Sequence, residues 1–414
     1  MSRYTGRLRC VRCSRSYPET STVDGCPACR EVAPSALLPE YDQVGLSGLP
    51  VRPEQPGLFR YRELLPLPDE AAPVSLDEGG TPLRPLTRTG ERLGIDRLLL
   101  KDETRNPTWS YKDRLAAVAI TAARHGDADT VVVSTTGNHG AAVAAYAAAA
   151  RLRCVVLTVA SVPQTMKTLM QVYGAEVVAV DRATDRWVLM QQLVRERGWW
   201  PMSGYRSPPV GSTPFGVDGY KTIAYEVVEQ LGAAPDVVVV PTAYADGLAG
   251  IVRGFRDLLG LGLIGRLPRA VVTEPFGPYR EALRTGADTV GPVPVRPSVA
   301  FSIASPVGTF QGLDALRVTA GTAVAVPDDD RILDAQAALG RDEGTYLEAA
   351  SVTGLVGVGD LRAAGEIRRE DVVVVIGTSS GLKDVGTTAS RQPPVPVIAP
   401  TLQALDEALG GVRS

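Results

Sequence analysis

Along residues 95–205, uninterrupted apolar runs alternate with segments whose apolar residues recur at helical spacing. β-Branched residues dominate most of these runs, which favours strands, and the periodic segments favour amphipathic helices. The runs are LLLK (98–101), TVVVST (130–135), CVVLTVA (154–160) and AEVVAVD (175–181), and the helical segments begin near Leu115, Ala141, Met166 and Arg186. Such alternation is typical of a parallel sheet covered on both faces. We therefore predict a smaller, mobile α/β lobe over residues 104–205.

The same pattern returns in the C-terminal half of the chain. Three further runs read PDVVVVPT (235–242), RAVVTEP (269–275) and DVVVVIGTSS (371–380). They predict a second, larger α/β lobe over residues 206–400. Ligands in such sheets collect at the carboxyl ends of strands, where the turns STTGN, PTAYADG and GTSSG follow three of the runs. The expected site therefore lies between the two lobes.

Residues 34–103 lead into the larger lobe, and their first part is rich in proline and polar residues. Too few apolar positions recur there for a separate core, so we predict an arm laid over the body of the protein. Its expected anchors are Tyr41, Phe59 and Tyr61, on this chain or on a partner subunit. At the other end, residues 401–414 are expected to form a terminal helix and tail.

Charge and hydropathy argue against two classes of partner. The 414 residues hold 43 Lys and Arg against 46 Asp and Glu, a formal net charge of −3, and no basic run stands out. We therefore expect no nucleic-acid partner and no membrane partner. The longest apolar run, residues 141–150, is too short to cross a bilayer, and the N-terminus lacks the apolar core of a signal peptide. A cytoplasmic protein is the expectation.

Four of the five cysteines form two close pairs, Cys10-x2-Cys13 and Cys26-x2-Cys29, separated by twelve residues. Two thiolate pairs at this spacing suit tetrahedral Zn²⁺, and in a reducing compartment zinc is favoured over disulfides. A catalytic zinc would need an open coordination position. We therefore predict a closed, structural zinc ribbon over residues 1–33.

Lys112 stands at the boundary between a strand and a helix, in the segment KDETRNPTWSYKDR (101–114). The polar NPT breaks the strand, and LAAVAITAARHG (115–126) continues as a helix. The positive end of the helix dipole disfavours an ammonium there, which suits a lysine that must react as an amine. A lysine at a helix start is more commonly a solvated side chain. The neighbouring motifs are therefore needed to judge whether Lys112 has a catalytic role.

Several motifs follow one another in a fixed order: EGGTPL (78–83), NPTWSYKDR (106–114), STTGNHG (134–140), DGYKTIAYE (218–226), PTAYADGLAG (241–250), YLEAAS (346–351) and GTSSGLKD (377–384). On these motifs the chain resembles the pyridoxal-phosphate enzymes of the threonine synthase and tryptophan synthase β type, and within them the threonine synthase branch. The resemblance implies fold type II, with two parallel-sheet α/β lobes and an N-terminal zinc ribbon. It also implies a pyridoxal 5′-phosphate cofactor, a small amino-acid substrate and a homodimer.

The resemblance also implies a role for each candidate residue. Lys112 would form a Schiff base with the cofactor and then move protons between Cα, Cβ and Cγ of the substrate. Asn138 would contact the phenolic oxygen of the cofactor, and Thr378 its ring nitrogen. The candidates for binding the substrate are Ser110, Thr135, Thr136, Gly137 and His139. Standing alone, the loop that holds most of them would be an ordinary helix cap.

The cofactor phosphate would be held by the turn after PDVVVV, where backbone amides at the start of a helix suit a dianion. The candidates are Thr242, Ala243, Tyr244, Ala245, Asp246 and Gly247. This turn departs from the usual glycine- and asparagine-rich version, and a carboxylate beside a phosphate is unfavourable. Asp246 is therefore expected to point away, to accept hydrogen bonds from backbone amides, or to face a cationic part of the substrate.

Three other positions differ from the usual threonine synthase sequence and bear on which substrate is bound. Threonine synthases usually have glycine where Trp109 stands and phenylalanine where Tyr111 stands, so a bulkier wall is expected beside the lysine. They usually have Thr or Ser in place of His139, which resembles the residue of serine/threonine dehydratases. We interpret His139 as a packing residue beside the cofactor rather than a proton shuttle.

The third departure is Gly216, which stands where threonine synthases tend to carry an arginine that grips the substrate phosphate. Loss of such a contact is costly for O-phosphohomoserine. Arg105, Lys167 and Lys221 are candidates to take over.

The leading hypothesis is a lyase that converts O-phosphohomoserine and water to threonine and phosphate. The alternative is a threonine-synthase-like enzyme of a specialised pathway, performing β-elimination or β-replacement on serine, threonine or an O-activated relative. A non-catalytic regulatory homologue is a hypothesis of another class, and the intact Lys112, Asn138 and Thr378 argue against it.

Overall fold

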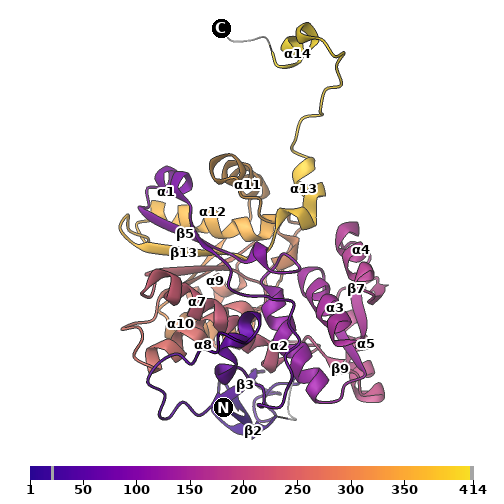
Figure 1. Cartoon of the computed structure of the whole chain (residues 1–414), viewed down its shortest axis with the longest axis vertical. Helices are drawn as coiled ribbons and strands as arrows, with labels where there is room; N and C mark the ends of the chain where they lie inside the picture. The colour runs from indigo at the N-terminus through magenta and orange to yellow at the C-terminus, as the bar shows by residue number, and fades with distance from the viewer. Residues whose placement is uncertain (20–22, 411–414) are drawn as a thin grey trace.

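The largest of three sheets forms the centre of the molecule in the computed structural model, which describes residues 1–19 and 23–410 (Figure 1). Its six strands stand in the order β12-β11-β10-β13-β5-β4, and every neighbouring pair is parallel except β4 with β5. The strands are β4 (Leu83–Pro85), β5 (Arg97–Asp102), β10 (Val237–Pro241), β11 (Arg269–Glu274), β12 (Thr322–Ala325) and β13 (Val372–Gly377).

Helices cover both faces of this sheet, as predicted for its continuous apolar strands. Val238 and Val240 join one core, whereas Val237 and Val239 join the core on the other face, because successive strand residues point to opposite sides. The first face carries α7 (Lys221–Leu231), α8 (Asp246–Gly260), α9 (Pro278–Thr285) and α10 (Phe310–Val318). The second carries α1 (Thr87–Leu93), α11 (Asp329–Glu343) and α12 (Ala349–Ala363).

A second parallel sheet has the strand order β8-β7-β6-β9. Its strands are β6 (Thr130–Ser134), β7 (Arg153–Val159), β8 (Glu176–Val180) and β9 (Trp200–Pro201), and the helices around it are α2 (Lys112–His125), α3 (Asn138–Ala150), α4 (Gln164–Val172) and α5 (Asp185–Arg197). Helix α3 packs on one core and α5 on another. The predicted strands and helices of this region are therefore confirmed, but the two-residue strand β9 was not foreseen.

The N-terminal residues form a small antiparallel sheet of order β2-β1-β3. Its strands are β1 (Tyr4–Cys10), β2 (Ser16–Pro18) and β3 (Leu37–Tyr41). Because β3 pairs with β1, this sheet continues past residue 33, where the ribbon was predicted to end. The predicted ribbon includes residues 20–22, which lie outside the described part of the chain.

The proline-rich segment is more deeply built in than an arm laid over the surface. Its turn of 3₁₀ helix, Gly57–Leu64, places Phe59 and Tyr61 in the main core with no exposed surface. The Tyr61 hydroxyl donates to Glu229 of α7 at 2.6 Å, and the Tyr41 hydroxyl donates to Asp218 at 2.6 Å. The three predicted anchors therefore bind this chain itself.

The last described segment stands away from the body in Figure 1 and carries α14 (Leu402–Ala408), in agreement with the predicted terminal helix. The predicted tail, residues 411–414, lies outside the described residues. Short elements complete the fold: α6 (Pro214–Val217), α13 (Val385–Ala389), and single 3₁₀ turns at Glu103–Arg105, Asp218–Tyr220, Phe301–Ile303 and Gly381–Asp384. Among the described helices, none has the length and apolar character needed to span a membrane.

Helices α7 and α8 cross closely, and glycine permits the contact. A Cβ atom at Gly254 would collide with the Lys221 carbonyl oxygen and lie 2.8 Å from the Ala224 Cβ. We expect Gly254→Ala to lower the free energy of unfolding by about 1–3 kcal/mol, measured by urea denaturation. The control is Gly340→Ala within α11, where no atom lies within 4 Å. That change should add about 0.5–1 kcal/mol, and equal effects of the two variants would contradict the packing argument.

Candidate active site

Lys112 is the first residue of α2, as predicted, and its neighbours are joined to the turn after β13. Ser110 and Ser379 form an antiparallel bridge, and the Tyr111 backbone N–H donates to the Thr378 carbonyl at 3.0 Å. The Ser110 hydroxyl accepts from the Lys112 backbone N–H at 3.1 Å, so this predicted substrate residue fixes the turn that leads into α2. Two motifs far apart in the sequence thus meet at Lys112.

Aromatic rings rather than Trp109 form the wall beside the lysine. The Tyr111 and Tyr220 ring centroids lie 4.9 Å apart, and the Lys112 Nζ lies 4.9 Å from the Tyr111 centroid. Trp109 has a φ of 59° and a side chain that is 43% exposed. Left-handed backbone favours glycine, which gives a physical reason for the glycine usual at this position. The expected bulkier wall is therefore wrong for Trp109.

Asn138, the first residue of α3, is held by a buried polar cluster from the larger lobe. Its amide donates to Glu348 at 2.7 Å, and its carbonyl accepts from Lys383 Nζ at 2.9 Å and from the Ser379 hydroxyl at 3.1 Å. Burial lowers the pKa of Lys383 to about 8. Glu348 and Lys383 received no role from the sequence, although both lie inside motifs that carried the resemblance.

The loop before α3 serves in part as a helix cap, which was the alternative interpretation. The Thr135 hydroxyl accepts from the backbone N–H groups of Gly137 at 3.1 Å and Gly140 at 3.3 Å. Burial, and then the charge of Lys112, lower the pKa of His139 to about 3, so its imidazole is neutral near pH 7. Its Nε2 is buried without a partner in the described structure, which leaves it ready to bond a ligand. Thr136, beside Gly137, is half-buried.

The turn from β10 to α8 fits a phosphate. Ala245 adopts a left-handed conformation with φ of 65°, and no side chain caps the first turn of the fifteen-residue helix. Asp246 is turned aside, because its Oδ1 accepts from the Ser212 backbone N–H at 3.1 Å and from Gln311 at 2.6 Å. One of the three predicted outcomes for Asp246, bonding to a backbone amide, is thus confirmed. The free amides of the helix start remain available to an anion.

Other predicted residues of the cofactor site adjoin this turn. The Tyr111 ring packs on the helix start, since a Cβ at Gly247 would lie 2.6 Å from its Cε2. Thr378 shares a hydrogen bond of 2.6 Å with Ser351 of α12, which fixes its hydroxyl. Thr242 and Ala243 begin the turn, and Thr242 is buried. The segments that carry the predicted lysine, ring-nitrogen and phosphate residues therefore adjoin one another.

Gly216 leaves no room for an anion-binding side chain. A Cβ atom there would lie 2.7 Å from Leu115 Cγ and 3.0 Å from the Leu115 carbonyl oxygen. Lys221 is fully buried and bonds Asp257 at 2.7 Å, so it cannot replace the missing arginine. Lys167 donates to the Ala160 carbonyl at 3.1 Å.

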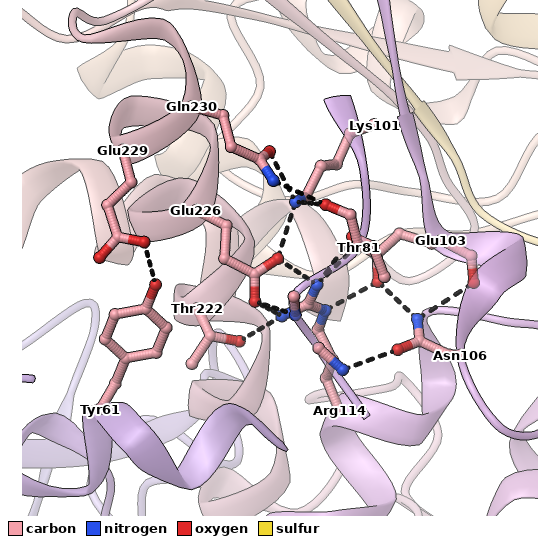
Figure 2. A network of polar contacts seen from close by, with 12 residues as sticks. Tyr61, Thr81, Lys101, Glu103, Asn106, Arg114, Thr222, Glu226, Glu229 and Gln230 are labelled. Carbon is pink, nitrogen blue, oxygen red and sulfur yellow. Dashed lines mark hydrogen bonds and ion pairs between the residues drawn. The ribbon is translucent and has the colours of Figure 1, made fainter. Parts of the chain in front are cut away.

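A buried network of charges surrounds Arg114 in the first turn of α2 (Figure 2). Arg114 follows Lys112 by two residues, is fully buried, and pairs with Glu103 at 2.7 Å and Glu226 at 2.7 Å. Lys101 of β5 bonds the second oxygen of Glu226 at 2.7 Å. Although burial opposes it, the two cations hold the pKa of Glu226 below its usual value. Two cations thus balance two carboxylates in a site without water access.

The hydroxyl and amide groups around the network complete its hydrogen bonding. Arg114 also donates to Thr81 at 3.1 Å and to Thr222 at 2.9 Å. The Asn106 amide donates to Glu103 at 2.8 Å and accepts from the Gly79 N–H at 3.0 Å. The network therefore joins three of the motifs, EGGTPL, NPTWSYKDR and DGYKTIAYE, at the start of α2.

The four paired cysteines gather at one point of the N-terminal sheet. Their sulfur atoms all lie within 4.8 Å of one another. Gly25, with φ of 72°, shapes the turn before the second pair. Four thiols at such distances match the ligand set of a tetrahedral metal site.

Removal of one carboxylate from the network tests its importance. We expect Glu226→Gln to lower the free energy of unfolding by about 3–5 kcal/mol, because Lys101 and part of Arg114 become buried without a counter-charge. Urea denaturation would measure the change. The control is Glu176→Gln, which removes the ion pair with Arg153 on the surface and should leave stability unchanged. A Glu226→Gln protein as stable as the wild type would contradict this role.

Comparisons with known proteins agree with this geometry. Residues 74–379 match the family model described as pyridoxal-phosphate dependent enzyme. A threonine synthase of Methanocaldococcus jannaschii is 34% identical, with 93% of this chain and 95% of the relative covered. One from Methanosarcina acetivorans is 32% identical over 98% of each. Maize serine racemase shares the fold, with a TM-score of 0.65, 19% identity, and 75% and 90% of the two chains covered. The chain therefore belongs to the pyridoxal-phosphate-dependent enzymes of fold type II, in the threonine synthase family.

Proposed function

We propose that this protein is a lyase that converts O-phosphohomoserine and water to threonine and phosphate. The observation that carries the proposal is the bridge between the segment before Lys112 and the turn that carries Thr378, to which Asn138 is joined through Ser379. Relatives named threonine synthase that match nearly the whole chain support the same activity.

Pyridoxal phosphate, when bound, would stabilise negative charge that develops on the substrate carbon next to the amino group. Lys112 would hold the cofactor, the amides of the turn from Thr242 to Gly247 would bind its phosphate, and Asn138 and Thr378 would bind its ring. Thr378 is a neutral hydroxyl fixed by Ser351, and such a partner suits elimination and replacement rather than transamination.

The chain's own side chains would handle the substrate and its protons. The Lys112 amine would take the proton from Cα and return protons at the neighbouring carbons, as a general base and acid. The rings of Tyr111 and Tyr220 limit the water around that amine. Gly137 and Thr136 would present the substrate carboxylate to the start of α3. Thr135 and Ser110 would act through the hydrogen bonds that shape these loops.

His139 would position the substrate rather than carry a proton. Its imidazole is neutral and its Nε2 is buried without a partner in the described structure. A neutral nitrogen can exchange one hydrogen bond with a bound molecule, but a base of such low pKa is a weak proton acceptor at neutral pH.

Gly216 favours a second candidate, a serine or threonine dehydratase built on the same fold. Its contact with Leu115 prevents an anion-binding arginine at this place. A hydroxy amino acid has no phosphate and would not require one.

We further propose a structural zinc ion, a homodimer and a cytoplasmic location. The clustered sulfur atoms of Cys10, Cys13, Cys26 and Cys29 support the zinc site. Homodimers are common in the family that the sequence resembles. The cytoplasmic location is proposed from the composition of the chain alone.

Product analysis tests the main proposal. We expect the holoenzyme to form threonine and free phosphate from O-phosphohomoserine, identified by NMR, with serine and threonine as parallel substrates. Lys112→Ala should lower the rate by about 100- to 10,000-fold, because it removes the general base. Arg124→Ala, which removes an exposed arginine in the last turn of α2, should keep the wild-type rate. An oxo acid and ammonia from serine or threonine, without turnover of O-phosphohomoserine, would favour the dehydratase instead.

Metal analysis tests the cysteine site. We expect purified protein to contain stoichiometric zinc, and Cys13→Ser to lose most of it and to melt at a lower temperature, because one of four ligands is removed. Cys154→Ser, a buried cysteine of strand β7, should keep the zinc. Wild-type protein that is stable and free of metal would disprove the site.

A further inference from the structure

Arg186 is a buried cation without a counter-charge. It lies in the first turn of α5 and is 7% exposed. Its Nε donates to the Ala183 carbonyl at 2.9 Å, but neither terminal nitrogen bonds any residue in the described ranges, and no carboxylate there lies within 4.0 Å. Burial lowers the pKa of Arg186, since a guanidinium is poorly solvated there. The terminal nitrogens are not among the buried polar atoms that lack a partner, so they stay accessible to a bound anion.

The two other buried arginines of the described structure use terminal nitrogens in hydrogen bonds, which sets Arg186 apart, although the Arg62 Nε lacks a partner. Arg114 has two carboxylates. Arg62 donates to three backbone carbonyl oxygens at 2.9–3.0 Å. Arg186 has one carbonyl contact and two unused terminal nitrogens, which are the atoms that form a forked pair with a phosphate.

The first turn of α5 packs against the turn predicted to hold the cofactor phosphate. Trp187, the residue after Arg186, packs edge-on against Tyr244 with ring centroids 6.4 Å apart. The Tyr244 carbonyl accepts from the Thr309 hydroxyl at 2.6 Å, which fixes the turn. Burial raises the pKa of the Tyr244 phenol, and the Arg186 charge opposes that rise, so the two groups are close. Arg186 thus reaches the site from the smaller sheet.

A phosphorylated substrate needs a cation at this end of the site. Gly216 cannot supply one, and Lys221 is committed to Asp257. Arg105 pairs with Asp102 and its side chain is 64% exposed. Among the cations considered, Arg186 combines burial, free donors and contact with the turn.

We propose that Arg186 binds the phosphate group of the substrate and so replaces the arginine that Gly216 displaces. This inference rests on the proposed function, because it assigns the recognition of its leaving group. Asp246 does not oppose the contact directly, since Ser212 and Gln311 hold its carboxylate. The specificity for a phosphorylated amino acid thus comes from the smaller lobe.

Kinetics of Arg186→Gln in the holoenzyme test the proposal. We expect kcat/KM for O-phosphohomoserine to fall about 10- to 100-fold, and the inhibition constant of inorganic phosphate to rise by a similar factor, because a charged hydrogen bond is lost. Binding of L-threonine, which has no phosphate, should be unchanged when followed by cofactor absorbance. Arg186→Lys should recover part of the loss. Arg182→Gln is the matched control, because Arg182 is 80% exposed and pairs with Asp185.

The outcomes separate this inference from the proposed function. Unchanged O-phosphohomoserine kinetics and phosphate inhibition in Arg186→Gln would overturn the inference and leave the function standing. A wild-type enzyme that does not turn over O-phosphohomoserine would remove the function. In that case calorimetric titration of the holoenzyme with inorganic phosphate decides: binding that Arg186→Gln abolishes supports an anion site, and binding that it leaves intact overturns it. Equal loss of threonine binding would also overturn it, because the residue would then be structural.

Discussion

The buried pairing of Arg114 with Glu103 and Glu226 is the constraint on which the site depends. Each partner comes from a different part of the chain: the end of β5, the start of α2 and the middle of α7. In the apolar interior, each charge of the network is costly unless it is paired. Few other arrangements of these three elements would keep every charge paired. A fixed start of α2 means a fixed Lys112, since the lysine is two residues from the guanidinium.

The site then follows from the arrangement of strand ends. The parallel neighbours β10 and β13 bring their carboxyl ends to one edge of the larger sheet. The segment after β6 of the smaller sheet joins the turn after β13 through Asn138. The Ser110–Ser379 bridge and the Tyr111–Gly247 contact close the distance between these turns. His139 Nε2 and Glu348 Oε1 are buried there without hydrogen-bond partners in the described structure.

Sequence patterns predicted the long elements well because parallel strands are buried on both faces and read as continuous apolar runs. The strands β4, β9 and β12 escaped because they are short and half-buried, and neighbouring strands define them. The fully buried Phe59 and Tyr61 also escaped recognition as core residues, since their burial depends on α7 and its neighbours.

The candidate site, like the fold, could be predicted only in part from the sequence. Lys112, Asn138 and Thr378 were predicted from motifs, and hydrogen bonds join the segments that carry them, although their roles stay a prediction. Arg186 was read only as part of a helix, because its burial and lack of an acid partner are tertiary properties. The boundaries of a mobile lobe at residues 104 and 205 stay a prediction.

The bridge between Ser110 and Ser379 has a mechanical consequence. It attaches the backbone before Lys112 to the turn that carries Thr378, so the lysine belongs to the frame of the larger sheet. Asn138 and Arg186 are carried by the smaller sheet. The Asn138 carbonyl accepts hydrogen bonds from Ser379 and Lys383 of the same turn, so the reactive amine and the first residue of α3 are fixed to each other through one junction.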